Sequence, residues 1–170
     1  MEPVSRTPVT RPAALPSWDR LAAPDRVRTR VTRRIDADPT STALLLAGPT
    51  AVDLWPGVRR VAEVAGRVVV EAELGPDRPV AASVTARPPR RTLTAYVSTF
   101  AWDGPGLPET SAELVLGYVP TGTGEVATHA ALVLDSRFTD TDIDPDGLQQ
   151  LARGFLANLA SAAETRNRAA

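Results

Sequence analysis

Residues 144–166 read DPDGLQQLARGFLANLASAAETR, and the rest of the predicted fold is built around this segment. At about 100° per residue its apolar positions fall within an arc of roughly 140°, which predicts one amphipathic helix. Asp144 is the predicted N-cap, and Pro145 suits the first helical position, where a missing N–H costs nothing. The apolar positions are Leu148, Leu151, Ala152, Phe155, Leu156, Leu159, Ala162 and Ala163. A helix with such a stripe needs an apolar surface to lie on.

The chain before this helix has the period of two that is typical of β strands with one buried face. The predicted strands are 26–36, 58–65, 67–74, 80–86, 92–102, 111–119 and 126–138. Short links, such as Gly66 between the second and third strands, indicate an antiparallel meander. In 92–102, Tyr96, Phe100 and Trp102 share one face, with Leu93, Ala95 and Val97 on the other, and the sequence does not decide which face is inward.

Between the first two strands, Asp38-Pro39 predicts the start of a short helix over 39–47, which Gly48-Pro49 ends. Residues 50–54 suit one further turn, and residues 44–46, all Leu, should supply the buried area of this region. The sequence Trp55-Pro56-Gly57 predicts a rigid corner into the sheet. Arg33 falls on the apolar parity of its strand, which leaves a bulge, a strand end or an Arg directed into a cavity as alternatives.

These elements predict an α+β fold, in which a curved seven-stranded antiparallel sheet wraps around the long C-terminal helix. One or two short helices follow the first strand. We expect residues 25–168 to form a single domain and residues 1–24, which hold five prolines, to be a mobile leader. Trp18 and Leu21 are the plausible anchors of that leader. A tail that packs its indole on the domain is favoured over a separate binding motif.

Composition excludes several classes of protein. A net charge of −1 provides no global field for nucleic acid, and the 19 basic residues, all Arg, come without an aromatic RNA-binding motif. The absence of cysteine excludes disulfides and thiolate chemistry. No apolar run approaches the length of a membrane span, and the N-terminus lacks a signal-peptide core. We therefore expect a cytoplasmic protein without a membrane span; a homodimer stays an open alternative.

Residues that commonly carry chemistry are sparse. His129 is the one histidine in the sequence, and its strand parity puts it opposite the apolar set, so a surface position is favoured over a general base. Asp140, Asp142, Asp144 and Asp146 alternate before the helix, but the closing Glu of a calcium loop is missing, and helix capping explains them better. We expect no metal and no cofactor, and no catalytic residue is identified.

The predicted binding site is a cavity between the sheet and the helix. Aromatic residues are only 5% of the chain, and Ala152, Ala162 and Ala163 lie on the apolar face of the helix, which suits either a close helix–sheet contact or an unfilled pocket. The order of the elements and the short corner at Trp55 favour the pocket. Aromatic walls bind flat or apolar ligands, and Tyr and Arg groups could polarise a ketone. The expected ligand-binding residues are Trp55, Arg60, Tyr96, Phe100, Trp102, Tyr118, Leu148, Leu151, Phe155 and Leu159. The aromatic members would serve equally well as ordinary core.

Four segments resemble the START-like helix-grip superfamily, in particular its polyketide cyclase/dehydrase and lipid-transport branch. Residues 31–56 resemble its first strand, Ala-x-Pro helix start and Trp-Pro corner, and residues 86–100 resemble its Pro-Pro strand entry. Residues 120–134 resemble its Gly-rich hairpin, and residues 154–164 resemble its closing helix. The resemblance covers about residues 26–166 and implies a helix-grip fold, but this scaffold hosts several functions.

Three functions follow as hypotheses. The first is a protein that binds a hydrophobic small molecule, aromatic or polyketide-like, between the sheet and the helix. The second, implied by the resemblance, is an aromatase/cyclase or dehydratase that acts on a polyketide chain, in which the pocket mainly orients a reactive substrate. The third is a protein-interaction module without a ligand. The sequence does not decide whether the protein is an enzyme.

Overall fold

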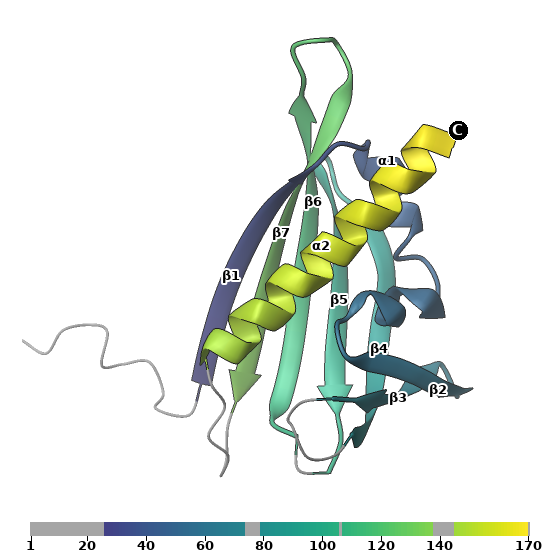
Figure 1. The fold of residues 1–170 in the computed structure, drawn as a ribbon, viewed down its shortest axis with the longest axis vertical. Coiled ribbons are helices and arrows are strands. Elements are labelled where there is room, and N and C mark those ends of the chain that lie inside the picture. Colours follow the sequence, from purple (N-terminus) through teal and green to yellow (C-terminus); the bar gives the residue numbers. More distant parts are fainter. Residues whose placement is uncertain (1–25, 74–78, 106, 138–144, 170) are drawn as a thin grey trace, which may run out of the picture.

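The structure is a computed structural model that describes residues 26–73, 79–105, 107–137 and 145–169. Seven strands form one antiparallel sheet in the order β1-β7-β6-β5-β4-β3-β2, and the long helix α2 runs diagonally across one face (Figure 1). The elements are β1 Arg26–Ile35, α1 Pro39–Leu44, the 3-10 helix η2 Pro49–Leu54, β2 Val58–Val64, β3 Arg67–Ala72, β4 Val80–Arg91, β5 Ala95–Asp103, β6 Glu109–Pro120, β7 Val126–Arg137 and α2 Pro145–Ala169. The predicted α+β architecture is confirmed.

The strand β1 is one edge of the sheet, and it pairs with β7 without a register shift from Arg26 to Ile35. Its side chains alternate between more and less exposed positions over most of its length, as the period of two predicts. Arg33 pairs with Ala130 and is exposed two residues before the strand ends. Of the three alternatives for Arg33, the structure therefore favours the strand end over the bulge and the buried cavity.

The helix α1 begins as the sequence predicts, because the Asp38 carboxylate accepts hydrogen bonds from the backbone N–H groups of Thr40 and Ser41. Those hydrogen bonds, from Ser41 and Thr40, outweigh the partial burial that would raise the pKa of Asp38, so this pKa lies below its usual value. The helix is shorter than predicted and ends at Leu44, whose side chain is 56% exposed. Leu46, beyond the helix, supplies the buried area instead.

The hairpin between β2 and β3 turns at Ala65 and Gly66, which both have positive φ, at 51° and 76°. Two successive residues with positive φ form the type of tight turn whose twist matches that of an antiparallel strand pair. The inward residues of β3 are Val68, Val70 and Ala72, and all three are buried as predicted. The hairpin at Gly66 is therefore confirmed.

The prediction that Pro88-Pro89 breaks the fourth strand is wrong. β4 continues through both prolines to Arg91, and the turn follows at residues 92–94, so β5 begins at Ala95 rather than at residue 92. The ladder between β3 and β4 ends at Val84, and the register between β4 and β5 shifts between Arg87 and Arg90. The prolines therefore lie at a bulge on a stretch where β4 has a described neighbour on one side only, which is where a strand tolerates a missing N–H.

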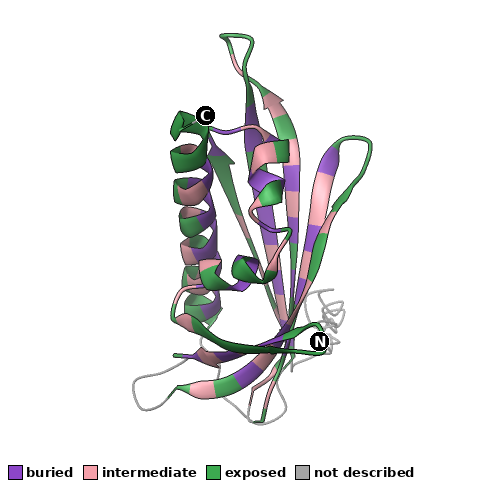
Figure 2. Ribbon diagram, turned by 90° about the vertical axis from the view of Figure 1, so that its right-hand side faces the viewer, coloured by how far each residue is buried: buried purple, intermediate pink, exposed green. Residues whose placement is uncertain are grey.

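The helix α2 turns its buried residues toward the sheet, and the main core lies between the two (Figure 2). Its buried residues are Leu148, Ala152, Phe155, Leu156, Leu159, Ala160 and Ala163. The inward face of β5 is the aromatic one, since Phe100 and Trp102 are buried and Leu93 lies fully exposed in the preceding turn. None of the helices in the described residues is long and apolar enough to cross a membrane. The expected leader, the Asp144 N-cap and Phe138 lie outside the described residues.

Candidate functional site

The centre of the space between sheet and helix is filled by aromatic side chains. The ring centroid of Trp55 lies 4.4 Å from that of Phe155 and 5.5 Å from those of Phe100 and Trp102, and the last two contacts are edge-to-face. Trp55, Phe100 and Phe155 are at most 1% exposed. Such pairs stabilise a core beyond the area they bury. The side chain of Trp55, in the corner before β2, therefore fills the middle of the space in which the sequence predicted a cavity.

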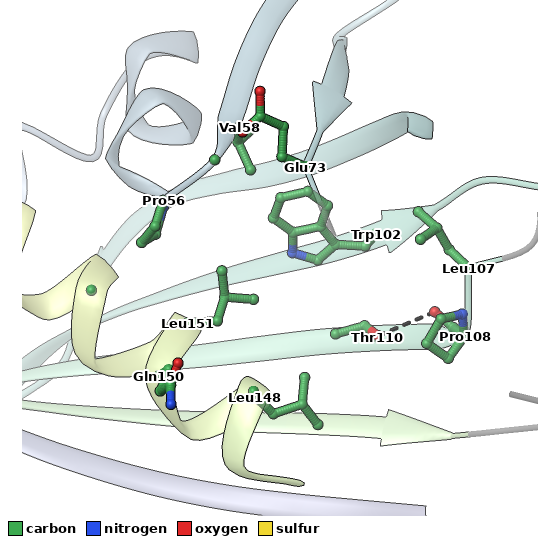
Figure 3. A pocket seen from close by; sticks show the side chains of 13 residues that line it. Pro56, Val58, Glu73, Trp102, Leu107, Pro108, Thr110, Leu148, Gln150 and Leu151 are labelled. Atoms are coloured by element: carbon green, nitrogen blue, oxygen red, sulfur yellow. Dashed lines mark hydrogen bonds between the residues drawn. The ribbon is translucent and has the colours of Figure 1, made fainter. Parts of the chain in front are cut away.

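A partly open pocket of about 640 Å³ lies beside this cluster, at the N-terminal end of α2. Figure 3 shows Leu148 and Leu151 projecting from α2 toward the strands that carry Trp102 and Thr110. The lining residues are Pro56, Gly57, Val58, Glu73, Trp102, Leu107, Pro108, Thr110, Gly147, Leu148, Gln150, Leu151 and Gly154. Most of this surface is apolar, and its volume falls within the range of about 300–1,000 Å³ that small-molecule sites occupy.

One wall of the pocket depends on a close contact between α2 and the corner after Trp55. A Cβ built on Gly154 would lie 2.4 Å from Cγ of Pro56, so only glycine allows this approach. One turn further along, Nδ2 of Asn158 donates to the backbone carbonyl of Leu54 at 3.0 Å. These two contacts hold the first half of α2 against the corner, and thereby fix the position of Leu151 relative to Trp102.

Polar groups at the pocket are few. The Thr110 hydroxyl donates to the Pro108 carbonyl at 3.1 Å and lies 2.8 Å from Oγ of Ser136, so its hydrogen bonds are made within the protein. Gln150 and Glu73 are exposed side chains at the rim. Among the described lining residues, Glu73 is the one with an ionisable side chain. The pocket therefore offers an apolar floor with a sparse polar rim.

The predicted ligand-binding residues divide into three groups. Trp102, Leu148 and Leu151 line the pocket. Trp55, Phe100, Phe155 and Leu159 are packed within the core, with at most 1% exposure, and none of them lines it. Of the two readings that the sequence left open for the aromatic residues, core packing describes Trp55, Phe100 and Phe155. The indole Nε1 of Trp55 has no hydrogen-bond partner among the described residues.

The third group, Tyr96, Tyr118 and Arg60, lies away from the pocket lining. The Tyr96 hydroxyl lies 3.1 Å from Oγ1 of Thr40 in α1, and the Tyr96 and Tyr118 ring centroids are 6.4 Å apart. The hydrogen bond with Thr40, supported by Tyr118, lowers the pKa of Tyr96 below its ordinary value. Arg60 pairs with Asp53, with 3.5 Å between Nη2 and Oδ2. The structure does not bring these three residues together with Leu148 and Leu151.

The described residues contain no group of three His, Asp or Glu side chains that could hold a metal ion. His129 is exposed on the outer face, as its parity predicts. Arg26 forms an ion pair with Asp135, and the hydrogen bond from its guanidinium lowers the pKa of that carboxyl. This pair lies on the sheet face opposite α2 and does not contribute to the pocket.

Most lining residues were not predicted from the sequence. Several lie in turns or at element ends, where strand parity says nothing, as with Pro56, Leu107 and Pro108. One signal was present in the helix itself, because Gly147 and Gly154 are seven residues apart and so share a face with Leu151. Glycines at that spacing on a covering helix leave room beside the side chains that flank them.

None of the protein-family models compared with the sequence matches it, and no curated protein matches it either. Solved structures do match. A conserved protein from Geobacillus kaustophilus superposes with a TM-score of 0.57 at 11% identity, over 82% of this chain and 96% of that one. The Zhui aromatase/cyclase from Streptomyces sp. R1128 superposes with a TM-score of 0.55 at 18% identity, over 85% of this chain and 97% of that one. A START superfamily protein from Mycobacterium smegmatis superposes with a TM-score of 0.54 at 16% identity, over 82% of this chain and 95% of that one.

At these identities the likeness concerns the fold and not the activity. The shared features are the open seven-stranded antiparallel sheet, the short helices after its first strand and the long helix that crosses it. The sequence resemblance predicted this same fold from four short segments. The described part of the chain therefore has the START-like, polyketide-cyclase type of helix-grip fold.

Proposed function

We propose that the protein binds a hydrophobic small molecule in the pocket at the N-terminal end of α2. The observation that carries this proposal is the pocket itself, about 640 Å³ with a largely apolar lining, beside the buried aromatic cluster of Trp55, Phe100 and Phe155. Leu148, Leu151 and Trp102 would contact the ligand through apolar surface, at about 25 cal/mol for each Å² removed from water. The ligand would be mostly apolar, with one polar group that reaches the rim near Gln150 or Glu73.

Binding without chemistry is favoured by what surrounds this pocket. A general base and a nucleophile must lie within hydrogen-bond reach of each other and of the reacting atom. Among the described lining residues, Glu73 is exposed at the rim, and the Thr110 hydroxyl already makes its hydrogen bonds to Pro108 and Ser136. This arrangement can hold and orient an apolar molecule, and it offers no activated nucleophile.

The proposal is tested with N-phenyl-1-naphthylamine, a neutral apolar fluorophore that becomes emissive when it leaves water. We expect saturable binding with a stoichiometry of one and a dissociation constant of micromolar order, about −8 kcal/mol. Leu151→Trp is the matched variant, since its larger apolar side chain narrows the pocket, and it should weaken binding while the circular dichroism spectrum is kept. Equal binding by this variant and the wild type would reject the pocket as the site.

An aromatase/cyclase is the second candidate, and the fold shared with the Zhui aromatase/cyclase supports it. In such an enzyme the pocket would orient a reactive poly-β-ketone chain, so few acid–base groups are needed. The test is turnover of a poly-β-ketone model substrate by the wild type, Tyr96→Phe, Tyr118→Phe and Arg60→Ala. No turnover by the wild type would reject the enzyme, and turnover that all three substitutions leave intact would exclude Tyr96, Tyr118 and Arg60 as the groups that polarise the ketone.

A further inference from the structure

We propose that the N-terminal leader of this same chain, residues 1–24, occupies the pocket at the N-terminal end of α2 (the end pocket). Trp18 and Leu21 would enter the pocket, so an external ligand must displace them. The pocket is the one assigned above to a small molecule, and competition with that ligand is the part of this inference that rests on the proposed function. Occupancy by the leader does not depend on it.

The first observation is where the described chain begins. Arg26 pairs with Arg137 in β7, and Arg137 pairs with Glu109 in β6. Glu109 stands between Pro108 and Thr110, which both line the pocket. Two strand spacings correspond to about 10 Å, so the leader joins the domain at the same end of the sheet as the pocket. Figure 1 shows the start of β1 and the first turns of α2 at this end.

The second observation is the length of the leader. Leu21 is five residues and Trp18 is eight residues before Arg26. An extended chain spans at most about 3.3–3.6 Å for each residue, so these side chains can reach roughly 17 Å and 27 Å from Arg26. Both distances exceed the two strand spacings to Glu109. The prolines at 12, 16 and 24 favour such an extended course, because proline fixes φ and removes helical hydrogen bonds.

The third observation is chemical complementarity. Trp18 is the one aromatic residue in the sequence of residues 1–24, and Leu21 adds a large apolar side chain three residues later, while the pocket presents Leu148, Leu151 and Trp102. Asp19 and Arg20 lie between Trp18 and Leu21, and Arg20 is the one that can pair with Glu73, the ionisable side chain among the described lining residues. Glu73 forms no ion pair with another described residue, which leaves its carboxylate available to Arg20.

Occupancy by the leader has a measurable consequence for affinity. When the binding-competent state is only a fraction of the population, the apparent dissociation constant rises by the reciprocal of that fraction. A leader that fills the pocket in about 90% of molecules weakens an external ligand roughly tenfold. Removal of the Trp18 side chain should therefore tighten binding of the external ligand by about three- to tenfold. Loss of a residue that contacts the ligand would weaken its binding instead.

The experiment uses full-length protein with Trp18→Ala, the conservative Trp18→Phe, and Leu93→Ser as a matched control at a fully exposed apolar side chain. Methyl and indole NMR spectra are recorded without any added ligand. With Trp18→Ala we expect the methyl signals of Leu148 and Leu151 and the indole N–H signal of Trp102 to shift, because a ring current is lost. Trp18→Phe should restore part of the shift, and Leu93→Ser should cause none.

Titration with N-phenyl-1-naphthylamine then separates the two proposals. Pocket signals that do not move in Trp18→Ala overturn the leader as occupant, whatever the probe does. Moved signals with unchanged probe affinity overturn the competition. Moved signals with no probe binding in any variant leave the leader in place and instead reject the external ligand of the proposed function. Moved signals with tighter probe binding in Trp18→Ala are the expected result.

Discussion

The α-carbon of Gly154 faces the ring of Pro56 so closely that an added Cβ would lie 2.4 Å from Cγ. Pro56 belongs to the corner after Trp55, and Gly154 lies in the first half of α2, so this contact joins the long helix to the corner that leads into β2. Both residues also line the pocket. The position of the helix and the shape of the pocket therefore depend on the same contact.

Gly154→Ala should destabilise the protein by about 1–3 kcal/mol, because overpacking forces the helix or the corner to move. Alanine is intrinsically better than glycine in a helix by about 1 kcal/mol, so a loss of stability identifies the steric clash as its cause. Urea unfolding measures the effect, and Ser161→Ala at an exposed position of α2 is the control. The double variant with Pro56→Ala should recover part of the loss. A stabilised Gly154→Ala protein would show that the contact is absent.

Phe155→Ala should cost about 3–5 kcal/mol, the usual range for removing a buried aromatic side chain. Phe155 is fully buried, with its ring centroid 4.4 Å from that of Trp55, so a cavity would remain. Phe155→Leu should cost less and leave probe affinity within about twofold, because Phe155 does not line the pocket. A large loss of affinity with Phe155→Leu would return this residue to the ligand-binding set that the sequence suggested.

Leu151→Ser should weaken probe binding by about tenfold, since removing a leucine contact forfeits roughly 1.5 kcal/mol of apolar burial. The side chain is only partly buried in the free protein, so the free energy of unfolding should change little. Leu44→Ser is the matched control, because Leu44 is 56% exposed on α1 and does not line the pocket. Equal losses of affinity in the two variants would argue that the probe binds to exposed apolar surface in general.

Asp38→Ala should cost about 0.5–2 kcal/mol near neutral pH, because it removes the N-cap of α1. The pKa of Asp38 is lowered in the folded protein, so its contribution is present above the unfolded value near 3.9 and is lost as the pH falls through the folded value. Wild type and Asp38→Ala should therefore converge in stability in acid. Asp38→Asn keeps the acceptor and should cost little at neutral pH. If the free energies of unfolding of wild type and Asp38→Ala differed by the same amount down to acid pH, the ionised Asp38 carboxylate would not be the source of the stabilisation.

The architecture could be predicted from the sequence because local patterns determine it. The stripe from Leu148 to Ala163, the alternation in β1 and β3, and the Asp38-Pro39 helix start each reflect the backbone geometry of one element. The error at Pro88 has a physical reason. Whether a proline ends a strand depends on which neighbours the strand has. That the pairing with β3 stops at Val84, because β3 begins at Arg67, cannot be read from residues 80–91 alone.

The candidate site was only partly predictable. Parity placed Phe100 and Trp102 on one face, but it could not show that Trp55 would fold into the space between them and Phe155 and fill it. The alanines of the helix that suggested an unfilled pocket include Ala152 and Ala163, which are at most 1% exposed and belong to the buried core. The pocket lies instead where turns and element ends meet, and these follow tertiary geometry rather than periodicity.

Methyl and indole NMR of the wild type with a bound apolar probe shows directly where the ligand lies. If the end pocket is the ligand site, adding N-phenyl-1-naphthylamine shifts the signals of Leu148, Leu151 and the Trp102 indole and leaves those of Tyr96 and Tyr118 in place. Shifts confined to Tyr96 and Tyr118, or no saturable shifts at all, would contradict the assignment.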